Sequence, residues 1–169
     1  MIVRLEEPRD RASALLVERE AFGGSVEAAI VEAVRDEPGS FALVAEDDGV
    51  IVGHVQLSRA WVGEEPVLAL GPIGVLPERQ GRRIGSSWVA AALEEAAGRG
   101  APAVILLGAP GYYGRLGFEP ATRHGLANPF AGETDEGFTI EEGDFQIAVL
   151  DEDRARRLAG NVRWHPAFG

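Results

Sequence analysis

The chain of 169 residues contains no cysteine. It also contains no lysine, so all 16 of its Lys and Arg residues are arginine. Without cysteine it has no disulfide, no thiolate nucleophile and no thiolate metal ligand. Without lysine it has neither a Schiff-base amine nor the lysine of a Walker-type phosphate loop. The histidines His54, His124 and His165 are far apart in the sequence and show no metal-ligand spacing. We therefore expect no metal site.

The sequence also lacks the run of roughly 20 apolar residues that a membrane-spanning helix needs. Its first ten residues, MIVRLEEPRD, lack the apolar segment of a signal peptide. We therefore expect a cytoplasmic protein without a membrane partner. A net charge of -11 and a pI near 4.7 argue against a broad basic face, and so against a nucleic-acid partner. The acidic charge instead favours a cationic or amine substrate.

Length and composition favour one globular domain over residues 1–169. Hydrophobic residues make up 46% of the chain and charged residues 25%, without a long polar tract that would stay disordered. A chain of this length can bury one sizeable core. We find no internal repeat.

The first half of the sequence predicts one strand, two helices and a three-stranded meander. Residues 2–6 predict the strand, and residues 9–22 and 25–35 predict the helices. In the first helix the apolar residues at helical spacing are Ala12, Leu15, Leu16 and Phe22. Apolar segments at 41–46 and 50–59, joined by an Asp-Asp-Gly turn, predict a hairpin, and residues 67–75 predict its third strand.

A βαβ unit follows the meander. The helix that begins near residue 83 carries one apolar face, made of Ile84, Trp88, Val89, Ala92, Leu93, Ala96 and Ala97. The apolar run 103–107 predicts a buried strand parallel to 67–75. Ligands of open sheets bind at the carboxyl ends of such strands, beside the N-terminus of the helix. Beyond it we expect a short helix around 112–116, irregular structure over 121–144 and a strand at 145–150.

The junction between strand 67–75 and the following helix predicts an anion site. Arg79, Arg82 and Arg83 cluster there in an otherwise acidic chain, with only Glu78 as a neighbouring carboxylate. The N-terminus of a helix carries unpaired N–H groups and a partial positive charge, so it favours a phosphate. A solvated run of charges is the alternative.

Three features of the chain resemble the GCN5-related N-acetyltransferase (GNAT) superfamily. They are the helix–helix–meander–βαβ order, the turn Gln80-Gly81-Arg82-Arg83-Ile84-Gly85, and the segment Tyr113-Gly114-Arg115-Leu116-Gly117-Phe118. The resemblance covers most of residues 1–118. It implies an α/β GNAT fold: a central mixed, mostly antiparallel sheet of about six to seven strands, with helices on both faces and a splayed parallel strand pair. Residues 108–118 and the tail 165–168 are similar to the small bacterial YhbS-like subgroup.

The resemblance implies acetyl-CoA as the cosubstrate. In the family, a Gln/Arg-x-x-Gly-x-Gly/Ala turn holds the pyrophosphate of coenzyme A, and the preceding strand binds the pantetheine arm and the thioester carbonyl. Gln80 and Gly85 match this turn, whereas Arg83 stands at the inner glycine position, where its side chain can itself pair with a phosphate. The implied cofactor-binding residues are Gly74, Val75, Leu76, Gln80, Gly81, Arg82, Arg83, Ile84, Gly85 and Ser86.

The resemblance also implies a catalytic residue, Tyr113, which stands where the family has its general-acid tyrosine. Its hydroxyl can protonate the leaving thiolate of coenzyme A. A packing role for one of the adjacent Tyr112 and Tyr113 is the alternative. No motif identifies a general base: His54, Glu64, Glu65 and Glu78 are candidates, and the family also uses ordered water.

The implied function is transfer of an acetyl group to a primary amine of an unidentified small molecule or peptide. The amine attacks the thioester directly, with no covalent enzyme intermediate, which agrees with the absence of cysteine. Two alternatives stay open. One is an acyl-CoA-binding or sensing module without turnover, and the other is an interaction domain whose arginines meet an acidic partner surface.

Overall fold

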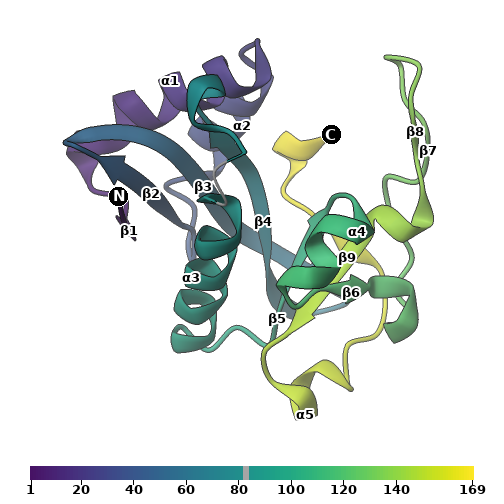
Figure 1. The fold of residues 1–169 in the computed structure, drawn as a ribbon. Helices are drawn as coiled ribbons and strands as arrows, with labels where there is room; N and C mark the ends of the chain where they lie inside the picture. Colours follow the sequence, from purple (N-terminus) through teal and green to yellow (C-terminus); the bar gives the residue numbers. More distant parts are fainter. Residues whose placement is uncertain (82–83) are drawn as a thin grey trace. The chain divides into compact units, whose positions relative to one another are not determined.

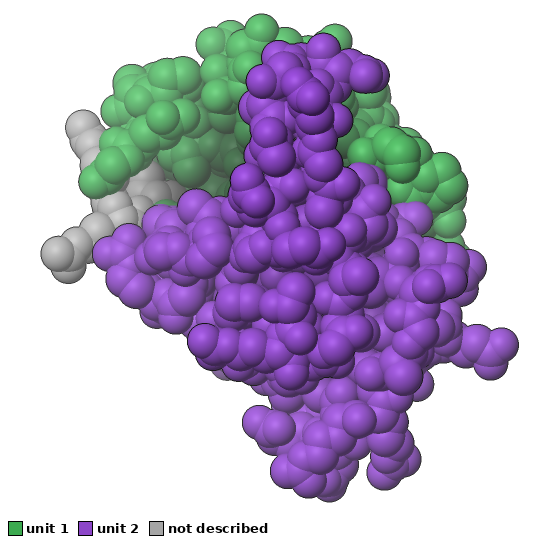
Figure 2. Space-filling model, turned by 90° about the vertical axis from the view of Figure 1, so that its right-hand side faces the viewer, with its two compact units in different colours: residues 1–59, 70–92, 165–169 green, residues 60–69, 93–164 purple. Residues whose placement is uncertain are grey.

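The structure is a computed structural model that describes residues 1–81 and 84–169. The chain divides into two compact units, which are coloured separately in Figure 2. Unit 1 comprises residues 1–59, 70–92 and 165–169, and unit 2 comprises residues 60–69 and 93–164. The boundaries fall within β3 (Val50–Val62), β4 (Glu65–Val75) and α3 (Ile84–Gly98), so each of these elements contributes residues to both units. The single domain over residues 1–169 stays a prediction.

The sheet of unit 1 runs in the order β1-β2-β3-β4. Strand β1 (Ile2–Leu5) pairs antiparallel with β2 (Phe41–Asp47), and β2 pairs antiparallel with β3, as the sequence predicts. Their turn is formed by Asp48 and Gly49, with φ angles of 50° and 78°. Positive φ at both central positions is the geometry of the tightest hairpin turns, which explains the Asp-Gly pair. Strands β2, β3 and β4 are one to three residues longer than expected, whereas β1 ends one residue earlier.

Helices cover both faces of this sheet. Short η1 (Pro8–Asp10) leads into α1 (Arg11–Phe22), which α2 (Val26–Val34) follows (Figure 1). On β4, Ile73 and Val75 pack in a cluster with Trp88 of α3, whereas Gly74 between them faces α1. Successive side chains of a strand point to opposite faces. Helices α1 and α3 therefore lie on opposite sides of the unit 1 sheet.

The buried face of α1 differs from the apolar positions that the sequence suggests. Leu16 and Phe22 are 53% and 48% exposed, whereas the buried residues of the helix are Ala14, Val17 and Glu18. Helical spacing alone gives the period of a helix, but the sheet determines which side of it is covered. Small Ala14 and compact Val17 let the helix approach the sheet closely, and a carboxylate shares their face.

Unit 2 contains the remaining strand pairs. Strand β4 pairs in parallel with β5 (Ala103–Leu107) through Leu68↔Val104 and Ala69↔Ile105, which confirms the predicted βαβ unit. Strand β5 pairs antiparallel with β9 (Phe145–Val149), and β9 pairs with β6 (Glu119–Pro120). The end of β3 pairs with β10 (Val162–Arg163). Ile105, Phe145 and Ile147 are buried at the centre of the core of this unit.

Hydrogen bonding over the described residues links eight strands, against the six to seven expected. The difference comes from two-residue strands such as β10, which is too short to leave a pattern in the sequence. Residues 121–144 are mostly irregular, as predicted, and hold η4 (Ala121–His124), η5 (Glu142–Asp144) and the hairpin of β7 (Gly132–Glu133) with β8 (Thr139–Ile140). The short helices are α4 (Pro110–Tyr113), η3 (Gly114–Leu116), α5 (Glu152–Ala155) and η6 (Pro166–Phe168).

Within the described ranges, no helix combines the length and the apolar character needed to cross a membrane.

Candidate functional site

The turn that joins β4 to α3 lies in unit 1 and is held by its own backbone. The N–H of Leu76 donates to the carbonyl of Val52 on β3 (3.0 Å). The chain then forms η2 (Pro77–Arg79), where the N–H of Arg79 donates to the carbonyl of Leu76 (2.8 Å). Gly81 follows with a φ of 77°, a left-handed conformation that favours glycine. The left-handed backbone therefore explains why residue 81, in the turn predicted to hold the pyrophosphate of coenzyme A, is a glycine.

The predicted arginine cluster at this turn is partly committed elsewhere. Arg79 forms an ion pair with Asp47, at the end of β2, so its charge is balanced within unit 1. The pairing joins residues 32 positions apart, and the sequence gives no sign of it. The predicted ligands Arg82 and Arg83 lie outside the described residues. Helix α3 begins at Ile84, with Gly85 half-buried and Ser86 exposed in its first turn.

The predicted thioester-binding segment, Gly74 to Leu76, lies beyond the described parallel ladder. That ladder ends at Ala69, and β4 continues for six more residues. The side-chain amide of Gln80 donates to the carbonyl of Val75 (3.0 Å), so the structure brings these two predicted residues together. A carbonyl oxygen has two lone pairs, so Val75 can accept a second hydrogen bond from a ligand.

Gly74 is a glycine because α1 packs directly against it. A Cβ at this position would lie 2.7 Å from Oε2 of Glu18 and 3.3 Å from Cβ of Ala21. A side chain at residue 74 would therefore displace the carboxyl group of Glu18. The carboxyl group of Glu18 therefore lies against the back of the strand segment that is predicted to bind the thioester.

Glu18 and His54 form a pair in the interior of unit 1. His54 Nδ1 and Glu18 Oε1 are 2.6 Å apart, and both residues are 0% exposed. Burial raises the pKa of Glu18, and the hydrogen bond with His54 opposes that rise. His54 Nε2 lies 3.7 Å from Oε1 of Glu6, which in turn accepts a hydrogen bond from Arg35 (3.1 Å). The base candidate His54 is thus part of a buried charged network.

Sequence reasoning did not single out Glu18. The one signal available is its spacing, since Glu18 lies four residues after Ala14 and next to Val17, on the buried face of α1. The other base candidates have simpler surroundings. Glu64 is exposed in the turn between β3 and β4, Glu78 is exposed in η2, and Glu65 forms an ion pair with Arg154 (2.5 Å).

The predicted catalytic residue Tyr113 lies in unit 2, at the end of α4. Its ring packs edge-on against Phe118, with centroids 5.8 Å apart, and against Tyr112 at 4.9 Å. Tyr113 is half-buried, whereas Tyr112 is 41% exposed. Burial raises the pKa of the Tyr113 phenol, and Tyr112 adds a smaller effect in the same direction. The hydroxyl is therefore protonated at neutral pH and can donate a proton or a hydrogen bond.

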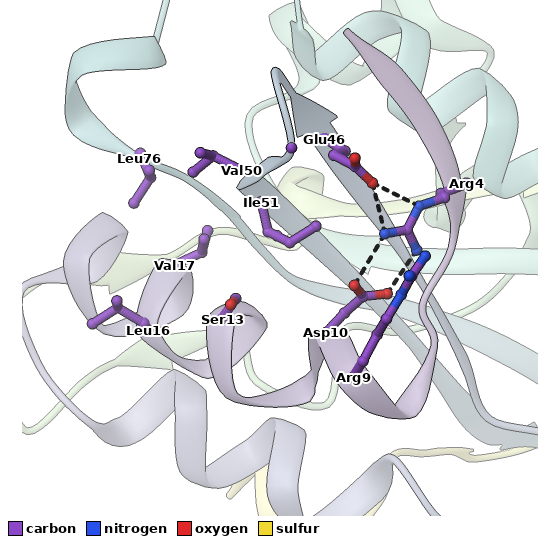
Figure 3. Close-up of a pocket in the computed structure, with 11 residues that line it drawn as sticks. Arg4, Arg9, Asp10, Ser13, Leu16, Val17, Glu46, Val50, Ile51 and Leu76 are labelled. Atoms are coloured by element: carbon purple, nitrogen blue, oxygen red, sulfur yellow. Dashed lines mark hydrogen bonds and ion pairs between the residues drawn. The ribbon is translucent and has the colours of Figure 1, made fainter.

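Unit 1 also contains an open pocket of about 460 Å³, bordered by Leu76 (Figure 3). One wall is charged: Arg4 bridges Asp10 (2.6 Å) and Glu46 (2.8 Å). The other wall is apolar and includes Val17 and Ile51. Because Arg4 lies between two carboxylates, the charged wall does not offer its positive charge to an anion.

No group of three histidine, aspartate or glutamate side chains in residues 1–81 and 84–169 is placed to hold a metal ion.

Comparisons with known proteins agree on one family. A model of the Acetyltransferase (GNAT) family matches residues 10–118. The chain is 30% identical to the uncharacterized N-acetyltransferase YhbS of Escherichia coli K12 over 172 aligned residues, covering 99% of this chain and 98% of that protein. It is 36% identical to the uncharacterized N-acetyltransferase YjhQ of the same strain, over 62% of this chain and 61% of that protein.

Two solved structures are similar over the whole chain. The crystal structure of the GNAT family N-acetyltransferase YhbS from Escherichia coli, in complex with CoA, has a TM-score of 0.86 and covers 99% of this chain and 91% of that one. A GNAT family acetyltransferase from Brucella melitensis, in complex with acetyl-CoA, has a TM-score of 0.76 and is 30% identical, covering 99% and 97%.

Proposed function

Because the chain belongs to the GNAT acetyltransferase family, we propose that it transfers the acetyl group of acetyl-CoA to a primary amine. The observation that carries this proposal is similarity over 99% of the chain to a relative solved in complex with CoA. A second relative of equal identity, solved with acetyl-CoA, supports the same cosubstrate. The acidic charge of the chain favours an acceptor that carries a positive charge.

The residues around the β4–α3 turn suit coenzyme A. The segment Gly74 to Leu76 supplies backbone groups beyond the parallel ladder for the pantetheine arm and the thioester. Gln80 and Gly81 shape the turn, and Gly85 and Ser86 begin α3, whose N-terminal dipole favours the pyrophosphate. Arg82 and Arg83 are assigned to the phosphates from their place in the sequence.

The reaction needs one nucleophilic attack and one protonation. The amine lone pair attacks the thioester carbonyl carbon, and a backbone N–H of β4 stabilises the oxyanion that forms. The C–S bond then breaks, its electron pair goes to sulfur, and the Tyr113 hydroxyl protonates the thiolate. A raised pKa keeps Tyr113 in the protonated form that this step uses. The attacking nitrogen becomes positively charged when it bonds to carbon, and the proton it then loses to give the neutral amide restores the Tyr113 hydroxyl.

Thiol release from acetyl-CoA in the presence of a panel of primary amines tests this proposal. The chain contains no cysteine, so every thiol that a thiol reagent detects comes from coenzyme A. We expect at least one amine to give stoichiometric thiol and acetylated product. Binding of acetyl-CoA without turnover on any amine would instead support the acyl-CoA-binding module.

Tyr113→Phe provides the site-specific test, with Tyr112→Phe as its matched control on the neighbouring position. Losing a general acid costs about 10²–10⁴-fold in rate. We expect Tyr113→Phe to lower kcat by that order while the affinity for acetyl-CoA is retained, and Tyr112→Phe to have a smaller effect. If Tyr113→Phe keeps the wild-type kcat when chemistry limits turnover, Tyr113 is a packing residue.

A further inference from the structure

A row of buried charged groups crosses the interior of unit 1. Arg35, at the end of α2, donates to Glu6, and Glu6 lies 3.7 Å from Nε2 of His54. His54 on β3 is 2.6 Å from Glu18 on α1, and Glu18 reaches the backbone of β4 at Gly74. The side chains of Arg35 and Glu6 are 7% and 8% exposed, and those of His54 and Glu18 are 0% exposed. A continuous row of ionisable side chains thus runs from the end of α2 to the backbone of β4.

Burying such groups is costly, and packing gives no reason for them. A buried ion pair is often no more stabilising than apolar residues of the same volume. One polar atom of the pair, His54 Nε2, also lacks a hydrogen-bond partner in the part of the chain that the structure describes. A buried titratable pair with an unused acceptor atom is typical of a site that handles protons.

The position of the pair relates it to the chemistry. Glu18 Oε2 lies 2.7 Å from the point where a Gly74 Cβ would stand. Gly74 belongs to the segment to which the thioester is assigned. The pair is therefore next to the strand at which the proposed reaction takes place, on the side that α1 covers.

We propose that the Glu18–His54 pair accepts the proton that the acceptor amine must lose before it attacks acetyl-CoA. This inference rests on the proposed function. An amine that binds as R–NH₃⁺ has no lone pair, so one N–H bond must break, its electron pair staying on nitrogen, and the proton passes through water to His54 Nε2. The proton returns to solvent after the transfer, and no other bond of the enzyme changes in this deprotonation step.

The network fits this role. With the Nδ1–H of His54 donating to Glu18, Nε2 carries the free lone pair that receives the proton. Glu18 acts through His54 and is a positioning residue, since its carboxylate fixes the ring and stabilises the imidazolium. Glu6 faces the protonated nitrogen and Arg35 holds Glu6, while Glu27 on α2 adds negative charge near Glu18.

The direction of the pH effect follows from these charges. When the pair already holds the extra proton it cannot take another, so the rate falls on acidification. Burial raises the pKa of Glu18, which favours proton uptake by the pair and moves this fall to higher pH. Replacing Glu18 by glutamine removes the charge that stabilises the imidazolium. The acidic fall in rate should then move to lower pH.

The experiment measures kcat/KM against pH for wild type, Glu18→Gln and His54→Gln, with acetyl-CoA and one amine found by the thiol-release screen. Glu20→Gln is the matched control, since Glu20 is exposed on the same helix. We expect a loss of at least tenfold at neutral pH in Glu18→Gln and His54→Gln, with the acidic limb displaced in Glu18→Gln. The titration of the amine itself is common to all variants and does not produce this displacement.

Ring nitrogen NMR gives a readout that does not depend on turnover. The chain has three histidines, so its imidazole spectrum is simple to assign. We expect His54 to gain a proton at Nε2 on acidification, and we expect the midpoint of this change to differ in Glu18→Gln. Glu18→Gln is a conservative substitution, so it provides the test even if His54→Gln does not fold. A His54 ring that keeps one protonation state, or a rate loss in Glu18→Gln that is uniform over pH, overturns the inference. If acetyl-CoA does not bind the wild type, the proposed function itself fails.

Discussion

The ring of Tyr113 lies against the backbone of Gly108, so closely that a Cβ at Gly108 would stand 2.2 Å from Cε2 of the ring. Gly108 follows β5, and its N–H donates to the carbonyl of Asp144 (2.8 Å), which fixes the backbone under the ring. The absence of a side chain at residue 108 therefore sets where the tyrosine lies.

Gly108→Ala should displace the Tyr113 ring and lower kcat while acetyl-CoA affinity changes little. An error of about 1 Å in a reacting group can cost on the order of 10²-fold in rate. Steady-state kinetics with an identified amine measures the effect. Gly111→Ala is the control, since a Cβ there meets no atom within 4 Å.

A double variant tests whether Gly108 acts through the tyrosine. If it does, adding Gly108→Ala to Tyr113→Phe should cost much less than Gly108→Ala costs alone, because the hydroxyl is already gone. Full additivity would show that Gly108 acts on something other than Tyr113.

Gly53→Ala should destabilise unit 1. A Cβ at Gly53 would lie 1.6 Å from Cη2 of Trp88, which is 1% exposed and held by α3. Overpacking of a rigid core typically costs about 1–3 kcal/mol in the free energy of unfolding, and a contact this short predicts a value at the upper end. Urea titration of the variant measures this loss. Gly98→Ala, where the new Cβ meets nothing within 4 Å, should leave stability unchanged or raise it slightly.

Asp10→Asn should destabilise the protein at neutral pH and not in acid. The hydrogen bond from Arg4 holds the pKa of Asp10 below its usual value, with a further contribution from the N–H of Glu7. A carboxyl whose pKa is lowered by folding contributes stability above its unfolded pKa and loses it as the pH falls through the folded pKa.

The expected loss for Asp10→Asn at neutral pH is about 1.5–3 kcal/mol, the range for hydrogen bonds to charged groups. Thermal unfolding of both proteins over a series of acidic pH values should show the two curves converging. Asp36→Asn is the control, because Asp36 is exposed and its ion pair with Arg11 contributes about 0–1 kcal/mol. A difference that persists undiminished in strong acid would rule out this electrostatic origin.

Charge reversal at Arg82 or Arg83 should weaken the binding of coenzyme A more than that of pantetheine, which has no pyrophosphate. Added salt should reduce coenzyme A affinity in the same direction. Isothermal titration of both ligands gives the comparison, and Arg123→Glu, an exposed position in unit 2, controls for net charge. Equal losses for both ligands would point to a disturbed start of α3 rather than to lost phosphate contacts.

Much of the fold follows from local patterns in the sequence. The Asp-Asp-Gly turn has the backbone angles that its residues favour, and the apolar run at 103–107 forms the parallel strand β5. Both depend on neighbours in the sequence. The face of α1 does not: Leu16 is exposed and Glu18 buried because the sheet, assembled from distant residues, determines which side of the helix is covered.

The candidate site divides in the same way. The turn from Gln80 to Gly85 and the tyrosine segment carry recognisable residues at fixed spacings. The pairs that give these residues their environment join distant positions: Glu18 with His54 are 36 residues apart, and Arg79 with Asp47 are 32 apart. Single-residue patterns do not reveal such pairs. The sequence indicated His54 as a base candidate, and the structure adds the carboxylate beside it.

The melting temperature of the purified chain with and without saturating acetyl-CoA tests the central claim most directly. A ligand that binds only the folded protein adds about 2.7 kcal/mol of stability at a hundredfold excess over Kd, which for a chain of this size raises the melting temperature by about 5–10 °C. We expect a rise of that order with acetyl-CoA and with coenzyme A. An unchanged melting temperature with both ligands would contradict the assignment of this chain as an acetyl-CoA-dependent enzyme.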